Sequence, residues 1–231
     1  AEVRYFTGFM TQFWQSPTRP WFVLLPASGK PIAVIPSIGE QLMKSCYIGD
    51  LRSWASPAEF DDGVTLLTTV IREQIGHSGK LGMMMGRETS IRMPLVDLQT
   101  LQNLLENVEF LDMTGDVQKI RMIKSPAEQK KLMHVCKIVS DVFTSLPEWT
   151  FAGMPLNELF RRFKIKALES GIDDVSYLVG GAGPNGYRDI IAPPNNHPLL
   201  NGDVFMLDTG CLWDGYFSDF NRNFAIHHAH D

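Results

Sequence analysis

The chain has 231 residues, 44% of them apolar, and a formal net charge of -5, which is the balance of a globular protein with one large or two ordinary domains. It contains no extended lysine or arginine run, and its apolar runs fall short of the roughly 18 residues of a membrane-spanning helix, so we expect neither a nucleic-acid nor a membrane partner. Three widely spaced cysteines without a CxxC pattern predict reduced thiols and a cytoplasmic protein.

The first half of the chain alternates strand-like and helix-like patterns. Residues 21–25 and 31–35 are short β-rich runs around the turn-forming cluster 26–30, which predicts a hairpin. Asp61-Asp62-Gly63 precedes a helix with one apolar face, made of Val64, Leu67, Val70 and Ile71. Three further elements are expected: a buried strand at 80–85, a helix at 94–105 and a strand at 108–112. This alternation predicts an α/β domain in which helices flank a layered sheet.

A domain boundary is expected near residues 116–125, immediately before a strong helix start. Ser125 is a good N-cap, Pro126 suits the first helical position, and Glu128 completes a capping box. The helix that follows carries an apolar stripe at helical spacing, made of Leu132, Val135, Val139 and Val142. Because proline breaks helices, we expect this helix to end before Pro147.

A second helix is predicted from about residue 156 to residue 170, with Gly171 as its C-terminal cap. Its expected inward-facing residues are Leu156, Leu159, Phe160, Phe163 and Leu168. Strand-like runs follow at 175–180, 203–209 and 216–225. Two helices followed by an antiparallel sheet are typical of an α+β domain.

Two aspartates flank the turn between the last two strands. Asp208 and Asp219 are expected side by side on this hairpin, where their charges repel unless a cation lies between them. A two-residue turn at Trp213-Asp214 would place the two acids directly opposite each other. The Asp214-Gly215 dipeptide instead favours a three-residue loop with Gly215 in the left-handed conformation and a bulge. Either register makes the acids cross-strand neighbours.

Paired carboxylates suit hard or borderline divalent ions such as Mn²⁺, Co²⁺ or Zn²⁺. Two such ions about 3.5–4 Å apart polarise a carbonyl and generate hydroxide near neutral pH. On spacing alone an acidic surface hairpin is the more common interpretation, because aspartate is frequent near turns. The residues around both acids shift the balance towards a metal site.

The hairpin carries an extended motif, written Asp208-x-Gly210, Gly215-Tyr216-x-Ser218-Asp219 and Arg222-x-Phe224. This motif resembles the metal-binding hairpin of the creatinase/aminopeptidase P/prolidase/methionine aminopeptidase superfamily, the pita-bread hydrolases. The resemblance extends upstream to the stretches Ile123–Glu128, Gly153-Met154 with Glu158-Leu159, and Pro198-Leu199 with Gly202-Asp203. It implies an α/β creatinase-type N-terminal domain over residues 1–118 and an incomplete α+β pita-bread catalytic domain over residues 119–231.

By this resemblance, Asp208 and Asp219 are the first two of five metal ligands, which together hold two divalent ions (Mn, Co or Zn). The other ligands of the family, a histidine and two glutamates, are expected beyond Asp231. We therefore expect a purified fragment of residues 1–231 to show no metal-stimulated hydrolysis. In homologues the N-terminal domain helps to form a homodimer, and this is the oligomer that the resemblance implies.

One position departs from the family pattern. The resemblance places the catalytic histidine of the family at Ile191, and an isoleucine can neither hydrogen-bond a substrate nor shuttle a proton. Tyr187, Arg188 and Asp189 lie in the same segment and are candidates for binding a different substrate, although polar loop residues are more often only solvated. Arg222 is expected either to orient Asp219 through an ion pair or to form only a cross-strand salt bridge.

Together these features predict a metal-dependent hydrolase that cleaves a C–N bond. Xaa-Pro dipeptides and peptides are the expected substrates, as for the dipeptidases and aminopeptidases of the family. Ile191 keeps a second class open, a small non-peptide amide or amidine as hydrolysed by creatinase or ectoine hydrolase. Retention of both aspartates argues against metal-free creatinase chemistry. The competing function is a non-catalytic binding protein on the same fold.

Overall fold

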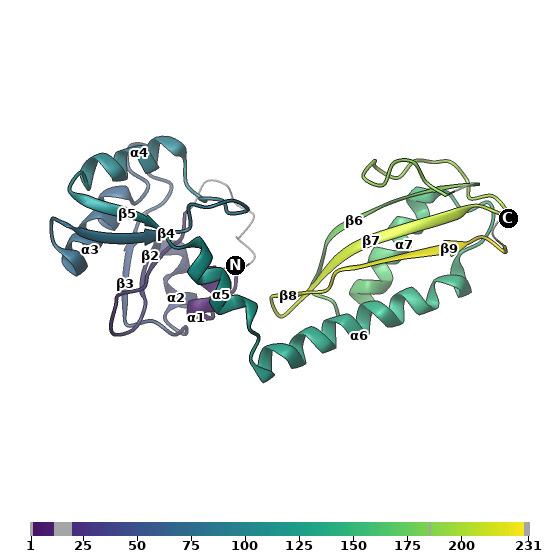
Figure 1. Cartoon of the computed structure of the whole chain (residues 1–231), viewed down its shortest axis with the longest axis horizontal. Coiled ribbons are helices and arrows are strands. Elements are labelled where there is room, and N and C mark those ends of the chain that lie inside the picture. Colours follow the sequence, from purple (N-terminus) through teal and green to yellow (C-terminus); the bar gives the residue numbers. More distant parts are fainter. Residues whose placement is uncertain (1, 12–19, 185, 229–231) are drawn as a thin grey trace. The chain divides into compact units, whose positions relative to one another are not determined.

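The computed structural model describes residues 2–11, 20–184 and 186–228. The chain divides into two compact units, Ala1–Met122 and Ile123–Asp231, which follow each other in the colour sequence of Figure 1. None of the helices in the described ranges is both long enough and apolar enough to cross a bilayer.

The N-terminal unit contains two small sheets. Its strands are β1 (Phe22–Leu24), β2 (Ile32–Pro36), β3 (Asp50–Trp54), β4 (Gly79–Met83) and β5 (Val108–Asp112). Its helices are α1 (Glu2–Thr7), α2 (Glu40–Met43), α3 (Val64–Ile75), α4 (Leu95–Leu104) and α5 (Thr114–Met122). β1 pairs antiparallel with β2, which confirms the predicted hairpin, and β2 pairs in parallel with β3. β4 and β5 form a separate parallel pair, so the unit has two sheets and not the single layered sheet that we expected.

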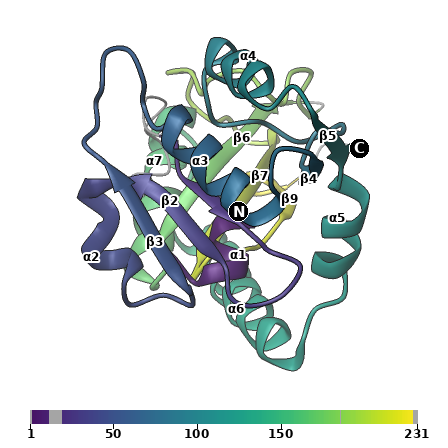
Figure 2. The same cartoon turned by 90° about the vertical axis from the view of Figure 1, so that its left-hand side faces the viewer.

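β2 lies at the centre of this unit because both of its faces are buried. Ile32 and Val34 belong to an apolar cluster with α3 and α4, and the alternate residues Ala33 and Ile35 belong to a second cluster with Phe9 and Met43. A strand covered on both faces requires a continuous apolar run, which the sequence Ile-Ala-Val-Ile supplies. Figure 2 shows β2 and β3 side by side.

The helix α3 presents the predicted apolar face to the core. Its inward residues are at most 4% exposed: Val64, Leu67, Val70 and Ile71. β4, in contrast, is not the buried strand that we expected, since its residues alternate between half-buried and exposed. Lys80 on its exposed face lies 3.5 Å from Glu109, its partner across β5. The alternation arises because the β4–β5 pair packs only one face against the core.

The C-terminal unit begins with the long helix α6 (Pro126–Trp149). Its predicted capping box is confirmed: the Glu128 N–H donates to Ser125 Oγ (3.3 Å), and the Ser125 N–H donates to Glu128 Oε2 (2.8 Å). The hydrogen bonds from the backbone and side chain of Ser125 hold the pKa of Glu128 below its ordinary value. The residues that open the unit therefore fix the start of its longest helix.

α6 does not end before Pro147, contrary to the prediction from the proline. The helix continues to Trp149, and the Thr150 N–H donates to Leu146 O (3.1 Å). A proline in the last turn removes one intrahelical hydrogen bond, because it has no N–H to donate. Leu146 is fully buried and Trp149 packs against the same core, so tertiary packing carries the helix past the proline.

The helix α7 (Leu156–Glu169) follows the predicted span and is terminated by Gly171, whose φ of 101° is a left-handed value that favours glycine. Four of its predicted inward residues are buried: Leu156, Leu159, Phe160 and Phe163. The prediction that Leu168 faces inward is wrong, because its side chain is 50% exposed and Ala167 is buried instead. Ala167 lies four residues after Phe163 and so continues the helical stripe, whereas Leu168 lies one position off it.

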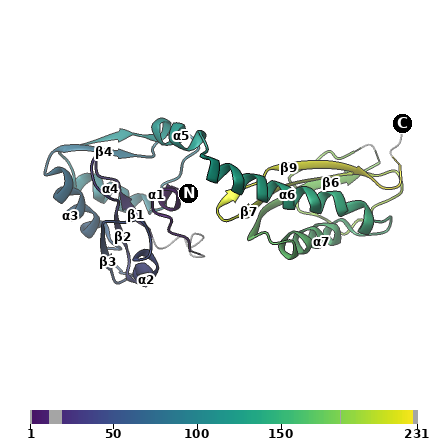
Figure 3. The same ribbon diagram turned by 90° about the horizontal axis from the view of Figure 1, so that it is seen from below.

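Four strands complete the α+β unit: β6 (Asp174–Gly183), β7 (Val204–Trp213), β8 (Tyr216–Phe217) and β9 (Phe220–Ala225). They form an antiparallel sheet in which β7 pairs with β6 on one side and with β8 and β9 on the other. α6 and α7 pack against one face of this sheet, as Figure 3 shows, and contact alternate residues of β7, namely Phe205, Leu207 and Cys211. Because side chains alternate along a strand, Asp208 and Gly210 belong to the opposite face.

Candidate metal centre

The hairpin that carries both acids has a two-residue turn. Trp213 pairs with Tyr216, and the intervening Asp214 and Gly215 have φ values of 45° and 80°. Two positive φ values are those of the type I′ turn, which the Asp-Gly dipeptide favours. The two predicted alternatives, a two-residue turn at Trp213-Asp214 and a three-residue loop with a bulge, are therefore both wrong, because the turn lies at Asp214-Gly215. Lys131 of α6 anchors the turn, since its Nζ lies 2.5 Å from Asp214 Oδ2.

One register runs through the whole hairpin and places Asp208 opposite Asn221. Asp219 lies two residues before Asn221, so the alternation of the strand assigns it to the same face of the sheet as Asp208. The two acids are diagonal cross-strand neighbours and not a directly opposed pair. The backbones of diagonal neighbours on one face lie about 7–8 Å apart. Their side chains can therefore reach each other or a shared partner.

Tyr177 of β6 joins this site from the neighbouring strand. It pairs with Gly210, and a Cβ at Gly210 would lie 2.2 Å from Cε1 of the Tyr177 ring, so the glycine provides the space in which the ring lies. The Tyr177 hydroxyl donates to Asp219 Oδ1 (3.0 Å). Burial, this hydrogen bond and the charge of Asp208 raise the pKa of Tyr177 to about 12, so the phenol stays protonated and remains a donor. Sequence reasoning missed Tyr177, because only the pairing register of β6 with β7 brings it to the acids.

One oxygen of the Asp208 carboxylate lacks a donor. This atom, Oδ1, is buried and has no hydrogen-bond partner among the described residues. Burial, together with repulsion from Asp219, raises the pKa of Asp208. A buried acceptor without a partner is costly, and so is a pair of like charges on one face. A cation between the two acids relieves both costs, so the residues present fit part of a metal site.

The described ranges contain no group of three or more His, Cys, Asp or Glu side chains arranged to hold a metal ion. Asp208 and Asp219 are thus two carboxylate ligands and not a complete coordination shell. Carboxylate oxygens are hard ligands, and they suit ions such as Mn²⁺ better than soft ions that prefer thiolates.

The structure does not bring Arg222 to Asp219. Arg222 lies opposite Leu207, on the face covered by the helices, where its guanidinium carbon lies 4.9 Å from the centroid of the Phe220 ring. Its Nη1 donates to Asn221 O (2.7 Å). No ion pair between Arg222 and Asp219 is found in the described part of the chain, and the role of Arg222 beside the acids stays a prediction.

The three candidate substrate-binding residues of the loop lie together. Tyr187, Arg188 and Asp189 line a pocket of about 460 Å³ between this loop and the end of β6. A Cβ at Gly181 would lie 2.7 Å from Asp189 O, so the loop crosses directly over this glycine. Asp189 Oδ1 accepts hydrogen bonds from two backbone N–H groups of the loop, so this carboxylate also shapes the loop itself. Ile191 is 78% exposed and does not line the pocket.

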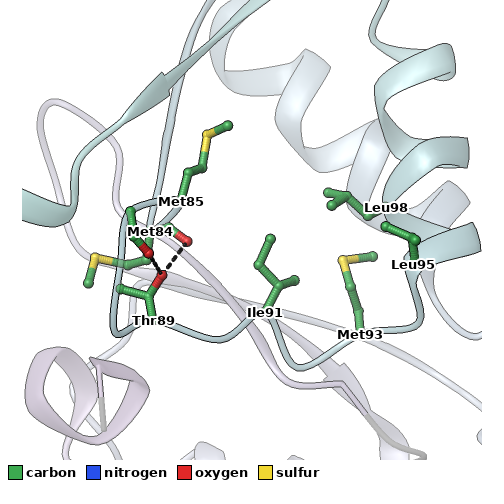
Figure 4. Close-up of a pocket in the computed structure, with 8 residues that line it drawn as sticks. Met84, Met85, Thr89, Ile91, Met93, Leu95 and Leu98 are labelled. Atoms are coloured by element: carbon green, nitrogen blue, oxygen red, sulfur yellow. Dashed lines mark hydrogen bonds between the residues drawn. The ribbon is translucent and has the colours of Figure 1, made fainter.

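The N-terminal unit has a pocket of its own, of about 330 Å³, which Figure 4 shows. Its lining is apolar apart from Thr89, whose hydroxyl donates to Gly86 O (2.6 Å) and lies 3.5 Å from Met84 O. No titratable side chain lines this pocket, so it offers no acid, base or metal ligand.

Comparisons with known proteins identify the family. Residues 1–123 match the Creatinase/Prolidase N-terminal domain, and residues 130–231 match Metallopeptidase family M24. The chain is 31% identical over 137 residues to Xaa-Pro aminopeptidase 3 of Rattus norvegicus, in a match that covers 58% of this chain and 26% of that protein. It is 28% identical over 126 residues to the Xaa-Pro aminopeptidase of Escherichia coli, covering 54% of this chain and 28% of that protein.

A solved prolidase from Thermococcus sibiricus has the same fold, with a TM-score of 0.80 and 24% identity over 97% of this chain. The chain spans 58% of the length of that prolidase, and its matching stretches cover about a quarter of the length of the two aminopeptidases. The fold of the two units agrees with the two family matches, to the Creatinase/Prolidase N-terminal domain and to Metallopeptidase family M24. The chain therefore belongs to the creatinase/M24 family of Xaa-Pro-peptidase-like proteins.

Proposed function

We propose that the protein is a metal-dependent hydrolase that cleaves the C–N bond of Xaa-Pro dipeptides or peptides. The observation that carries this proposal is the pair Asp208 and Asp219 on one face of the sheet, with Asp208 Oδ1 buried and unpartnered. The relatives support the substrate class, since the proteins with matching sequences include Xaa-Pro aminopeptidases.

Each residue of the site has a role in this proposal. Asp208 and Asp219 hold divalent metal, and the Tyr177 hydroxyl keeps the Asp219 carboxylate in one orientation through its hydrogen bond. When bound, the metal polarises the substrate carbonyl and lowers the pKa of a water molecule. Gly210 leaves the space that lets Tyr177 reach this position.

Several finer features are part of the same proposal. The metals and the homodimer follow from the family resemblance, the cytoplasmic location follows from the widely spaced cysteines, and substrate binding is assigned to loop residues that depart from the family pattern. The intact protein binds two divalent ions, with Mn²⁺ preferred and Co²⁺ or Zn²⁺ as alternatives. It works as a homodimer in the cytoplasm. Tyr187, Arg188 and Asp189 bind the substrate from the loop that lines the pocket beside β6.

The isoleucine at position 191 favours a second candidate substrate, a small non-peptide amide or amidine. Ile191 supplies no hydrogen bond and no proton to a peptide substrate, and its exposed side chain lies outside the pocket. A third outcome, a non-catalytic binding protein, applies if metal binds but nothing is hydrolysed.

The test is metal-dependent turnover by the intact protein. After removal of metal with EDTA, the protein is assayed with and without Mn²⁺ against an Ala-Pro dipeptide, an Xaa-Pro tripeptide and a small amide without proline. We expect hydrolysis of an Xaa-Pro substrate at least 100-fold faster with Mn²⁺ than without it, because the metal would polarise the substrate carbonyl and activate the attacking water. Turnover of the small amide alone would establish the second substrate class. Equal rates with and without metal would contradict the proposed function.

A further inference from the structure

Gly181 on β6 lies on the face of the sheet that carries the acids. It pairs with Met206, and Met206 lies two residues before Asp208 on β7, so the alternation of the strand assigns all three positions to one face. Two residues along a strand span about 7 Å. Met206 is 3% exposed, although it takes no part in the apolar cluster that packs against α6 and α7. Another segment therefore covers this end of the acid face.

The loop that follows β6 lies on this end of the face. A Cβ built on Gly181 would lie 2.7 Å from Asp189 O and 3.0 Å from Tyr187 Cβ, so both residues lie directly over the glycine. Tyr187, Arg188 and Asp189 line the pocket of about 460 Å³ beside β6, and Gly181 lines it as well. The three residues to which substrate binding is assigned are therefore in contact with the sheet at Gly181, or next to that contact.

The loop has a fixed internal shape. Asp189 Oδ1 accepts hydrogen bonds from the Ile191 N–H (3.0 Å) and from the Ala192 N–H (3.1 Å), which closes a turn within the loop. Because the turn ties these residues together, a displacement of the Asp189 backbone also displaces its neighbours. The contact of Asp189 O with Gly181 therefore helps to position Tyr187 and Arg188.

The two adjacent glycines of β6 provide space for different neighbours. A Cβ on Gly180 would clash with Met206 O of the paired strand, so this glycine serves the sheet. At Gly181 the three atoms nearest to a built Cβ all belong to the loop, and its φ lies outside the left-handed region. An alanine at 181 therefore fits the strand and clashes with the loop. Since the contacts are with a backbone carbonyl and a Cβ, no side-chain rotation relieves them.

We propose that Gly181 is a positioning residue for the substrate. Its lack of a side chain lets the loop lie on the sheet, and this places Tyr187, Arg188 and Asp189 beside the acid pair. The inference deepens the proposed function and rests on it for the substrate and for the binding role of the loop. Gly181 acts through the loop and not by contact with the substrate. The position of the loop can be measured on metal-free protein, separately from any hydrolysis.

Trypsin digestion of EDTA-treated intact protein measures the position of the loop. Arg188 is exposed, but trypsin cleaves after it only when the surrounding chain opens, so a loop held on Gly181 is cut slowly. In Gly181→Ala the loop has to leave the sheet, and we expect cleavage after Arg188 to be at least about tenfold faster. Cleavage after Lys137 of α6 and Arg161 of α7, followed by mass spectrometry, reports unfolding of the whole unit and should keep its wild-type rate.

Steady-state kinetics of the metal-loaded protein on an Xaa-Pro substrate then test the role of the loop. Gly181→Ala should raise KM at least about tenfold and leave kcat within about threefold, because substrate-binding groups move while the acids on the hairpin stay in place. For the same reason the affinity for Mn²⁺, measured by isothermal titration calorimetry, should match that of the wild type. A loss of folded protein would lower the apparent kcat without raising KM, so KM separates the two explanations.

Gly115→Ala is the matched control. It makes the same change in α5, where no atom lies within 4 Å of a built Cβ, and it should alter neither the cleavage after Arg188 nor KM. Absence of turnover in the wild type would contradict the proposed function. A wild type with turnover and a Gly181→Ala variant with unchanged KM would contradict only the positioning role.

Three results would overturn the inference. Cleavage after Arg188 at the wild-type rate in Gly181→Ala would show that the glycine does not hold the loop. Faster cleavage together with an unchanged KM would show that the loop has no part in substrate binding. Faster cleavage after Lys137 and Arg161 as well would show that Gly181 supports the fold of the whole unit and not the position of the loop.

Discussion

Replacing Phe163 with alanine is expected to lower the free energy of unfolding of the C-terminal unit by about 3–5 kcal/mol. The Phe163 side chain is fully buried, and its ring centroid lies 4.9 Å from that of Phe143 on α6. The substitution removes this aromatic contact and leaves a cavity between α6, α7 and the sheet. Denaturant unfolding followed by circular dichroism measures the change.

Leu168→Ala is the matched control on the same helix. It also removes a large apolar side chain from α7, but Leu168 is 50% exposed and contributes no buried cluster residue. Its cost should stay below about 1 kcal/mol. Equal losses for the two variants would contradict the assignment of Phe163 to the core and of Leu168 to the surface.

Gly210→Ala is expected to destabilise the same unit by about 1–3 kcal/mol and to displace Tyr177 from Asp219. The new Cβ would lie 2.2 Å from Cε1 and 2.9 Å from Cδ1 of the Tyr177 ring, so the ring has to move. The hydrogen bond from the tyrosine hydroxyl to Asp219 is then lost. Denaturant unfolding gives the cost, and a crystal structure or the tyrosine NMR signals report the position of the ring.

A double-mutant cycle isolates the clash. In a Tyr177→Ala background the ring is absent, so Gly210→Ala should cost at least about 1 kcal/mol less than in the wild type. Gly115→Ala serves as the control, because Gly115 lies in α5 with no atom within 4 Å of a built Cβ and an ordinary φ. That change should be neutral or slightly stabilising. Additive effects of the Gly210 and Tyr177 substitutions would show that the ring does not occupy this space.

Local signals in the sequence were sufficient for most elements of the fold. The capping box at Ser125 and the stripe of α7 depend on residues within one or two turns, and both are present as predicted. Pro147 misled the prediction because the buried Leu146 lies in the next-to-last turn and its packing outweighs the lost hydrogen bond. Leu168 misled the prediction of inward residues on α7, because the buried stripe of that helix passes through the smaller Ala167.

The candidate site was predictable only in part. The spacing of Asp208 and Asp219 identified the hairpin and the shared face, but the turn type, and with it the diagonal pairing, depends on two backbone angles at Asp214 and Gly215. Tyr177 could not be assigned, because it lies more than thirty residues before Asp208 and reaches the acids through the register of β6.

Mn²⁺ binding by the intact protein tests the central claim most directly, with isothermal titration calorimetry on the wild type, Asp208→Asn and Asp219→Asn. Both substitutions keep the side-chain shape and remove the charge. We expect each to weaken Mn²⁺ binding at least about 10-fold, because each removes an anionic oxygen ligand. Asp174→Asn, an exposed acid at the far end of β6, should leave the affinity unchanged. Wild-type affinity in both Asp208→Asn and Asp219→Asn would show that the two acids form a surface hairpin and not a metal centre.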